Sequence, residues 1–159
     1  MGKKDKTSRA RAWFEKLVER DPCVFTASML DAMTSKEVGD IGESLAADYL
    51  FRHGLDIVEF NYRCPEGEAD LIAFDPDTEQ IVLVEVKTRR REERSDVVYP
   101  EEAVTPRKER RYRRIAAQYA MERFPVPAIR FDVVAVTLTP GCLASCEHIE
   151  GAFDWDAGL

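Results

Sequence analysis

The first half of the chain carries apolar residues at helical spacing. Within residues 37–53 apolar side chains return every three or four positions, and Gly54 supplies a C-terminal stop. A row of small residues beside this stripe would let the helix approach a sheet and bring Glu43 with it; the row consists of Gly39, Gly42, Ala46 and Ala47. Residues 1–36 form an extension, with one amphipathic helix predicted from Ala10, Trp13, Phe14, Leu17 and Val18.

Strand patterns follow. Runs rich in Val, Ile, Phe and Tyr are separated by turn sequences, which predicts an antiparallel meander; the expected strands are 56–64, 68–75 and 80–88. Thr105 and Pro106 then begin a helix that runs to about Phe124, whose core-facing residues are Tyr112, Ile115, Ala116, Tyr119 and Ala120. This helix leads to a buried strand at 129–138, whereas the tail from Gly141 has no clear period.

Composition narrows the class of protein that this α/β pattern can belong to. The 159 residues are 45% hydrophobic and 33% charged, which is typical of one soluble domain, here residues 37–159, plus the extension. No apolar run is long enough for a bilayer or a signal peptide, so we expect a cytoplasmic protein without a membrane partner. The four cysteines are then expected to be reduced; a zinc site at Cys142, Cys146 and His148 would have only three close ligands.

The net charge of −7 is unevenly distributed. Residues 87–94 carry five bases and two acids, and residues 107–114 carry six bases and one acid. Because Lys and Arg contacts to phosphate dominate nucleic-acid binding, this asymmetry indicates a basic binding face. A solvated surface without a partner is the alternative.

Two strands bring acidic residues together. If residues 76–79 form the loop, counting back along the ladder places Asp70 opposite Glu85 and Glu68 opposite Lys87. Like charges in directly opposed positions destabilise a sheet, so a cation or substrate should compensate them. Mg²⁺ prefers such oxygen ligands, and in hydrolysis of a phosphodiester it would activate the attacking water. An ordinary surface hairpin remains the alternative.

Four ordered blocks, residues 39–46, 61–73, 84–89 and 130–133, resemble the YraN-like, Holliday-junction-resolvase-related endonuclease family. The resemblance implies the PD-(D/E)XK fold, a restriction-endonuclease-like mixed β-sheet with an antiparallel meander flanked by helices. It also implies Mg²⁺, with Mn²⁺ as a substitute. The implied metal ligands are Asp70, Glu85 and the Val86 carbonyl. Lys87 matches the catalytic lysine, and Glu43 matches an acidic residue on the first helix that would bind metal or accept a proton.

The resemblance predicts an endonuclease that cuts branched or structured DNA, acting as a homodimer. Basic residues suited to phosphate contact are Arg63, Arg89, Lys108, Arg111 and Arg114, with Tyr112 interleaved. A nuclease-like module that binds nucleic acid without cutting it, in DNA processing or uptake, is the main alternative. A domain whose basic helix binds an acidic protein is a third.

Overall fold

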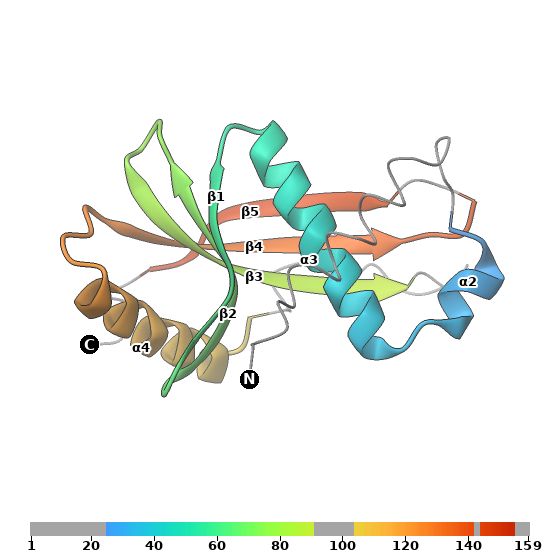
Figure 1. The fold of residues 1–159 in the computed structure, drawn as a ribbon, viewed down its shortest axis with the longest axis horizontal. Helices are drawn as coiled ribbons and strands as arrows, with labels where there is room; N and C mark the ends of the chain where they lie inside the picture. The colour runs from blue at the N-terminus through green and yellow to red at the C-terminus, as the bar shows by residue number, and fades with distance from the viewer. Residues whose placement is uncertain (1–24, 91–103, 142–143, 155–159) are drawn as a thin grey trace, which may run out of the picture.

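The computed structural model describes residues 25–90, 104–141 and 144–154. These residues form a five-stranded sheet in the order β1-β2-β3-β4-β5, with helices packed on it (Figure 1). The helices are α2 (Ala27–Ala32), α3 (Ser35–Arg52) and α4 (Pro106–Glu122). The strands are β1 (Asp56–Cys64), β2 (Gly67–Asp75), β3 (Gln80–Arg90), β4 (Ile129–Leu138) and β5 (Ser145–Phe153).

The sheet is mixed, as the sequence predicts. β1, β2 and β3 form the antiparallel meander, α4 crosses over, and β4 then pairs with β3 in parallel. β5 pairs antiparallel with β4 and was not predicted from the tail. Its sequence contains Ser, Glu, His and Gly, which have little strand preference, so it depends on the apolar β4 beside it. This mixed α/β architecture is compatible with a restriction-endonuclease-like fold.

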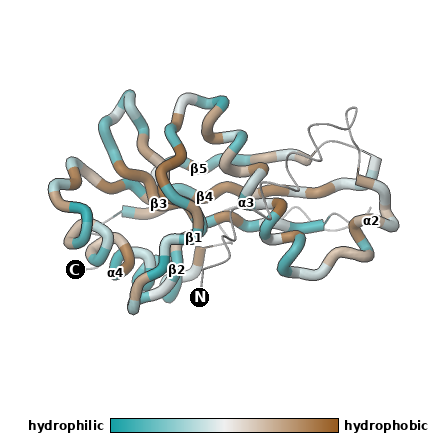
Figure 2. Tube along the Cα trace, viewed as in Figure 1, coloured by the Kyte–Doolittle hydropathy of each residue, from teal (hydrophilic) through white to brown (hydrophobic). Residues whose placement is uncertain are grey.

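The central strands contain many apolar residues (Figure 2), and these residues belong to two core clusters. Val82 and Val84 lie in one core cluster with α3, whereas Leu83 of the same strand lies in a second cluster with α4. This alternation is the period of two expected for a strand covered on both sides. Beyond Val84, β3 carries polar residues that face both helices: Glu85 contacts α4, and Thr88 lies against α3.

α3 lies very close to the sheet. A Cβ atom added at Gly42 would stand 1.7 Å from Oγ1 of Thr88 on β3, so only glycine fits at this crossing. Ala46 and Ala47 on the same face are also buried. The row of small residues therefore does what the sequence predicts, and it carries the neighbouring Glu43 to the sheet.

The N-terminal segment belongs partly to this core. Phe25, Leu30 and Met33 are buried in the cluster that contains α3. The Nη1 atom of Arg90 donates to the carbonyls of Leu30 and Met33, at 2.6 and 3.0 Å. The domain boundary expected between residues 36 and 37 thus falls inside a packed unit. The amphipathic helix expected at 10–18 lies outside the described residues.

α4 forms as its sequence predicts. The Thr105 side chain accepts a hydrogen bond from the Lys108 amide, Pro106 stands in the first turn, and the helix ends at Glu122, two residues before the expected end. Tyr112, Ile115, Ala116 and Tyr119 are buried. No helix in the described segments is long and apolar enough to cross a membrane.

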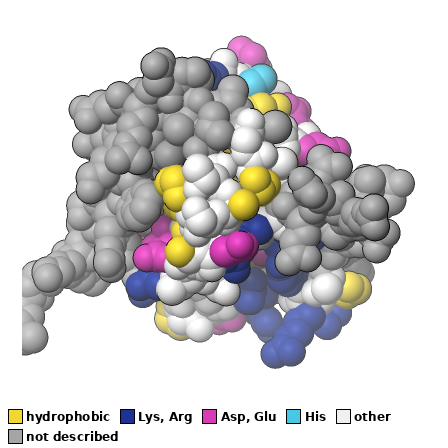
Figure 3. Space-filling model, turned by 90° about the vertical axis from the view of Figure 1, so that its right-hand side faces the viewer, with side chains coloured by type: hydrophobic (Ala, Val, Ile, Leu, Met, Phe, Trp, Pro, Cys, Tyr) yellow, Lys and Arg dark blue, Asp and Glu magenta, His cyan; other side chains and the backbone are white. Residues whose placement is uncertain are grey.

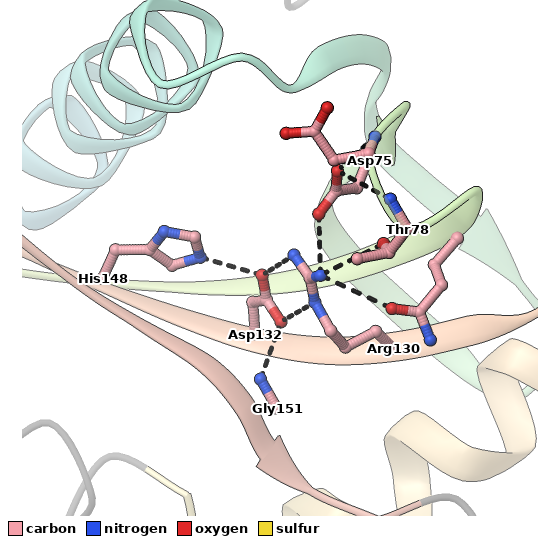
Figure 4. Close-up of polar contacts among 8 residues, drawn as sticks. Asp75, Thr78, Arg130, Asp132, His148 and Gly151 are labelled. Carbon is pink, nitrogen blue, oxygen red and sulfur yellow. Dashed lines mark hydrogen bonds and ion pairs between the residues drawn. The ribbon is translucent and has the colours of Figure 1, made fainter.

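A buried ionic cluster joins three strands on the α3 side of the sheet (Figure 4). Asp132 of β4 accepts hydrogen bonds from Arg130 at 2.8 and 3.0 Å and from the Gly151 amide at 3.0 Å. The Nε2 atom of His148 lies 2.8 Å from the same carboxylate. Arg130 also donates to Asp75 at the end of β2, at 2.8 Å. The cluster thus ties β2, β4 and β5 together.

Candidate active site

The candidate site lies where β2 and β3 separate. Their ladder runs from Asp75 and Gln80 to Leu71 and Val84 and then stops, although β3 continues beside β4 to Arg90. Beyond the last pair, the Val86 amide donates to the Oδ2 atom of Asp70 at 2.8 Å. A side-chain carboxylate therefore bonds a backbone donor of β3 where the strand ladder ends.

The carboxyl groups of Asp70 and Glu85 meet at this point. Burial raises the pKa of Asp70 to about 8, the Glu85 charge and a hydrogen bond with Glu85 add to the rise, and the Val86 amide opposes it. The register predicted from the loop at 76–79 is therefore the observed one as far as Leu71 and Val84, and it brings the two acids together.

The second predicted pair does not form. Because the ladder stops at Leu71, Glu68 has no partner on β3 and instead accepts from Arg63 of β1 at 2.6 Å. Lys87 is exposed at the edge of a cleft. The expected Glu68–Lys87 contact is wrong, because the β1–β2 hairpin bends away from β3 (Figure 1).

Glu85 is held by α4. Lys108 Nζ donates to its Oε1 at 2.8 Å, and the Tyr112 hydroxyl donates to its Oε2 at 2.5 Å. Tyr112 is only 2% exposed, and burial with the charges of Asp70 and Glu85 holds its pKa well above the usual range. The Tyr112 hydroxyl therefore keeps its proton and donates. Its expected contact with DNA is excluded by burial, and sequence reasoning missed its contact with Glu85.

Glu43 approaches from α3 on the other side. Its charge contributes to the raised pKa of Asp70, so the two acids are within electrostatic reach. Asn61 of β1 donates its amide to Glu43 at 3.1 Å and has a φ of 50°. Asn is one of the few residues that adopt this backbone region readily, and the conformation turns its side chain toward α3. Asn61 was not predicted as a site residue; a polar Asn within an apolar strand was the available signal.

A cleft of about 1120 Å³ opens beside Glu43, and Asp70 and Glu85 are not among the residues that line it. Its walls come from α2, the first half of α3 and the end of β3; its lining includes Leu30, Asp31, Glu43, Val86, Lys87 and Arg89. The residues of α2 were expected to belong to the extension, and their place in a wall of the cleft was not predicted from the sequence. Lys87 and Glu43 thus share one solvent-filled space, although they come from different elements.

The remaining basic residues lie around the β1–β2 hairpin and α4. Arg114 pairs with Glu66 at 3.5 Å, and Arg111 packs beside Gly67 and over the Tyr112 ring. Lysine and arginine side chains gather along the lower edge of the face shown in Figure 3. The predicted phosphate contacts other than Tyr112 therefore lie at or near the surface, and several have acidic partners.

The oxygen ligands fit a hard divalent cation. Among the described residues, no three His, Cys, Asp or Glu side chains already form a metal cage. Asp70 and Glu85 are nevertheless oxygen donors in contact, and their mutual repulsion is what a bound cation would relieve. The alternative zinc site at Cys142, Cys146 and His148 is not favoured, because the His148 ring already contacts Asp132. Cys142 lies outside the described residues.

The sequence is similar to proteins of several species. A UPF0102 protein of Renibacterium salmoninarum is 44% identical over 119 residues, which cover 74% of this chain and 97% of the relative. A UPF0102 protein of Mycobacterium tuberculosis is 40% identical over 126 residues, covering 77% of this chain and 96% of the relative. The profile described as "Uncharacterised protein family UPF0102" matches residues 42–136, and the chain belongs to this family.

Proposed function

We propose that the protein is a metal-dependent endonuclease of the PD-(D/E)XK type that hydrolyses phosphodiester bonds in branched or structured DNA. The observation that supports this proposal most directly is the contact between Asp70 and Glu85 where β2 and β3 separate. A fold gains no stability from two adjoining acids, so their contact indicates a function. Lys87, two residues beyond Glu85 on the same strand, adds the cation such a site needs.

The proposed roles follow from where the side chains lie. Asp70, Glu85 and the Val86 carbonyl would hold Mg²⁺ or Mn²⁺, which when bound lowers the pKa of water and stabilises charge on phosphoryl oxygens. Lys87 in the cleft would bind the attacking water or a phosphate oxygen. Glu43, which accepts a hydrogen bond from Asn61, would accept the proton of that water or hold a second ion.

Substrate binding would rest on phosphate contacts. Arg89 in the cleft and Arg63, Arg111 and Arg114 near the hairpin are suited to bind the DNA backbone, which positions a duplex without reading its sequence. We therefore expect selection by DNA shape. Two copies of the chain would be needed to cut paired strands at a junction.

The test is a cleavage assay on labelled four-way junction, flap, single-stranded and duplex DNA, with Mg²⁺, Mn²⁺ or a chelator. Asp70→Asn should abolish cutting, and Asp77→Asn, an equal change in the exposed β2–β3 turn, should not. Lys87→Ala should also abolish it. Cleavage that persists in chelator, or in Asp70→Asn at the parent rate, would refute the proposal.

A module that binds nucleic acid without cutting it is the second candidate. It is favoured by the engagement of both Glu85 oxygens by Lys108 and Tyr112, which leaves this ligand already neutralised. In that case the purified protein should bind junction DNA with an affinity that falls steeply with salt and should leave it intact with every ion tested.

A further inference from the structure

Glu85 is held by two donors that differ in how easily they can leave. Tyr112 is buried in the second core cluster, with its ring edge-on to Phe153 at 6.4 Å. The Lys108 side chain is 31% exposed and extends from the first turn of α4. Tyr112 therefore cannot leave Glu85 without disrupting the core, whereas the flexible lysine stem can rotate into solvent.

The Lys108 ammonium also occupies the position of a counter-ion. It lies 2.8 Å from Oε1 of Glu85, whose side chain is only 13% exposed. Two cations on the same carboxylate oxygen repel each other strongly where water is scarce. A divalent ion that binds through this oxygen must therefore displace the ammonium.

The released lysine would lie near an anion-binding position. α4 begins at Pro106, so Lys108 is beside the positive dipole end of a 17-residue helix. Arg107 and Arg110 flank it on the same turn and are exposed. A phosphate of bound nucleic acid would find several positive groups there, and Lys108 would add one more.

We propose that Lys108 is an exchangeable cation that neutralises Glu85 in the metal-free protein and moves to a nucleic-acid phosphate when a divalent ion binds. The inference rests on the proposed function, because it takes Glu85 as a metal ligand. Ion and nucleic acid then bind with positive coupling, and the coupling is reciprocal: each raises the affinity for the other by the same factor. Tyr112 keeps Glu85 oriented during the exchange.

The first test measures Mn²⁺ binding to the full chain by electron paramagnetic resonance, without DNA. Lys108→Gln should bind Mn²⁺ at least about fivefold more tightly than the parent, because the competing ammonium is gone. Lys108→Arg should resemble the parent, and so should Arg107→Gln, the matched control on the same turn. Lys108→Met serves as a second neutral variant if Lys108→Gln does not fold. Equal or weaker Mn²⁺ binding by the neutral variants would overturn the exchange.

The second test measures binding of a labelled four-way DNA junction as a function of salt, in a Lys87→Ala background that should not cut. With Mn²⁺, Lys108→Gln should lower the slope of log affinity against log salt by about one, the value for one lost phosphate contact. With chelator the slope should not change. An equal decrease in both conditions, or no decrease in either, would overturn the exchange.

The outcomes separate this inference from the nuclease proposal. If the parent cuts DNA with Mg²⁺ but the neutral Lys108 variants bind Mn²⁺ no more tightly, Lys108 is not exchanged and the nuclease assignment stands. If no variant binds Mn²⁺ and the parent does not cut, both ideas fail. If the parent binds no Mn²⁺ even with junction DNA present and Lys108→Gln does, Lys108 blocks the ion without leaving Glu85, and the exchange is overturned.

Discussion

Asp132 offers a sharp test of how the fold is held together. Its side chain is fully buried, and it accepts two hydrogen bonds from Arg130 and one from the Gly151 amide, with the His148 ring on its second oxygen. Replacing Asp132 with Ala leaves all these donors behind, and the guanidinium keeps its ion pair with Asp75 and the nearby charge of Glu150. The strands β4 and β5 then lose their common acceptor, and β2 stays linked to β4 only through the bond from Arg130 to Asp75.

The cost follows from what is left unpaired. Removing one partner of a buried ion pair typically costs about 3–5 kcal/mol, because the remaining charge is neither solvated nor compensated. Asp75 offsets part of this cost, but Arg130 is only 11% exposed and solvent reaches it poorly. For a chain of this size, about 2–4 °C of melting temperature is lost per kcal/mol, so Asp132→Ala should lower the Tm by roughly 6–20 °C.

The measurement is urea unfolding followed by circular dichroism, together with a thermal scan, in chelator. Asp77→Ala is the matched control, since Asp77 lies exposed in the β2–β3 turn and its side chain has no role in the cluster. Asp132→Asn should fall between the parent and Asp132→Ala, because an amide oxygen can still accept from the Gly151 amide. A loss below about 1 kcal/mol for Asp132→Ala, the level of an exposed ion pair, would refute the reasoning.

Three further outcomes are expected. Burial opposes the charged form of Asp132, but bonds from His148, Arg130 and Gly151 hold its pKa below the usual value; its stabilisation is therefore complete above about pH 4 and is lost in acid. Acid unfolding should be less steep in Asp132→Asn than in the parent. Gly42→Ala should cost about 1–3 kcal/mol by urea unfolding, because its Cβ would collide with Thr88, whereas Gly39→Ala meets no atom and should be tolerated. Asp70→Asn should melt above the parent at pH 8 in chelator and level with it at pH 4, because a carboxyl whose pKa is raised to about 8 destabilises the fold as it ionises above its unfolded pKa. A lower Tm for Asp70→Asn at pH 8 would contradict this.

Sequence patterns predicted the elements that depend on local signals. The bounds of β1 and β4 agree with prediction, and the cap at Thr105 with Pro106 fixes the start of α4. α2 and β5 were missed for a shared reason: each is held by other parts of the fold. α2 is fixed by Arg90 of β3, and β5 is held by β4 and by the Asp132 cluster. Short segments of this kind have no periodic signal of their own.

The candidate site was also predictable only where its residues follow from local sequence patterns. The acidic pair of Asp70 and Glu85 followed from a loop position and a count along two strands. The contacts of Lys108 and Tyr112 with Glu85 could not follow, because they depend on how the crossover helix packs against the sheet, and their spacing equally suited a solvent-facing phosphate contact. Asn61 was missed because its role comes from its backbone conformation, which a strand pattern does not encode.

Two carboxylates on this sheet, the fully buried Asp132 and the half-buried Asp70, have opposite environments. The contrast separates a structural role from a functional one. Asp132 is surrounded by donors, and its pKa is lowered, so its charge stabilises the fold. Asp70 has one amide donor, contacts Glu85 and lies within electrostatic reach of Glu43, so its pKa is raised and its ionisation destabilises the fold. The neighbours of Asp70 are acids, whereas a donor like the Arg130 beside Asp132 would stabilise the folded protein more. An acid whose ionisation is opposed by burial and by neighbouring acids, and would be favoured by a bound cation, is what a metal site requires.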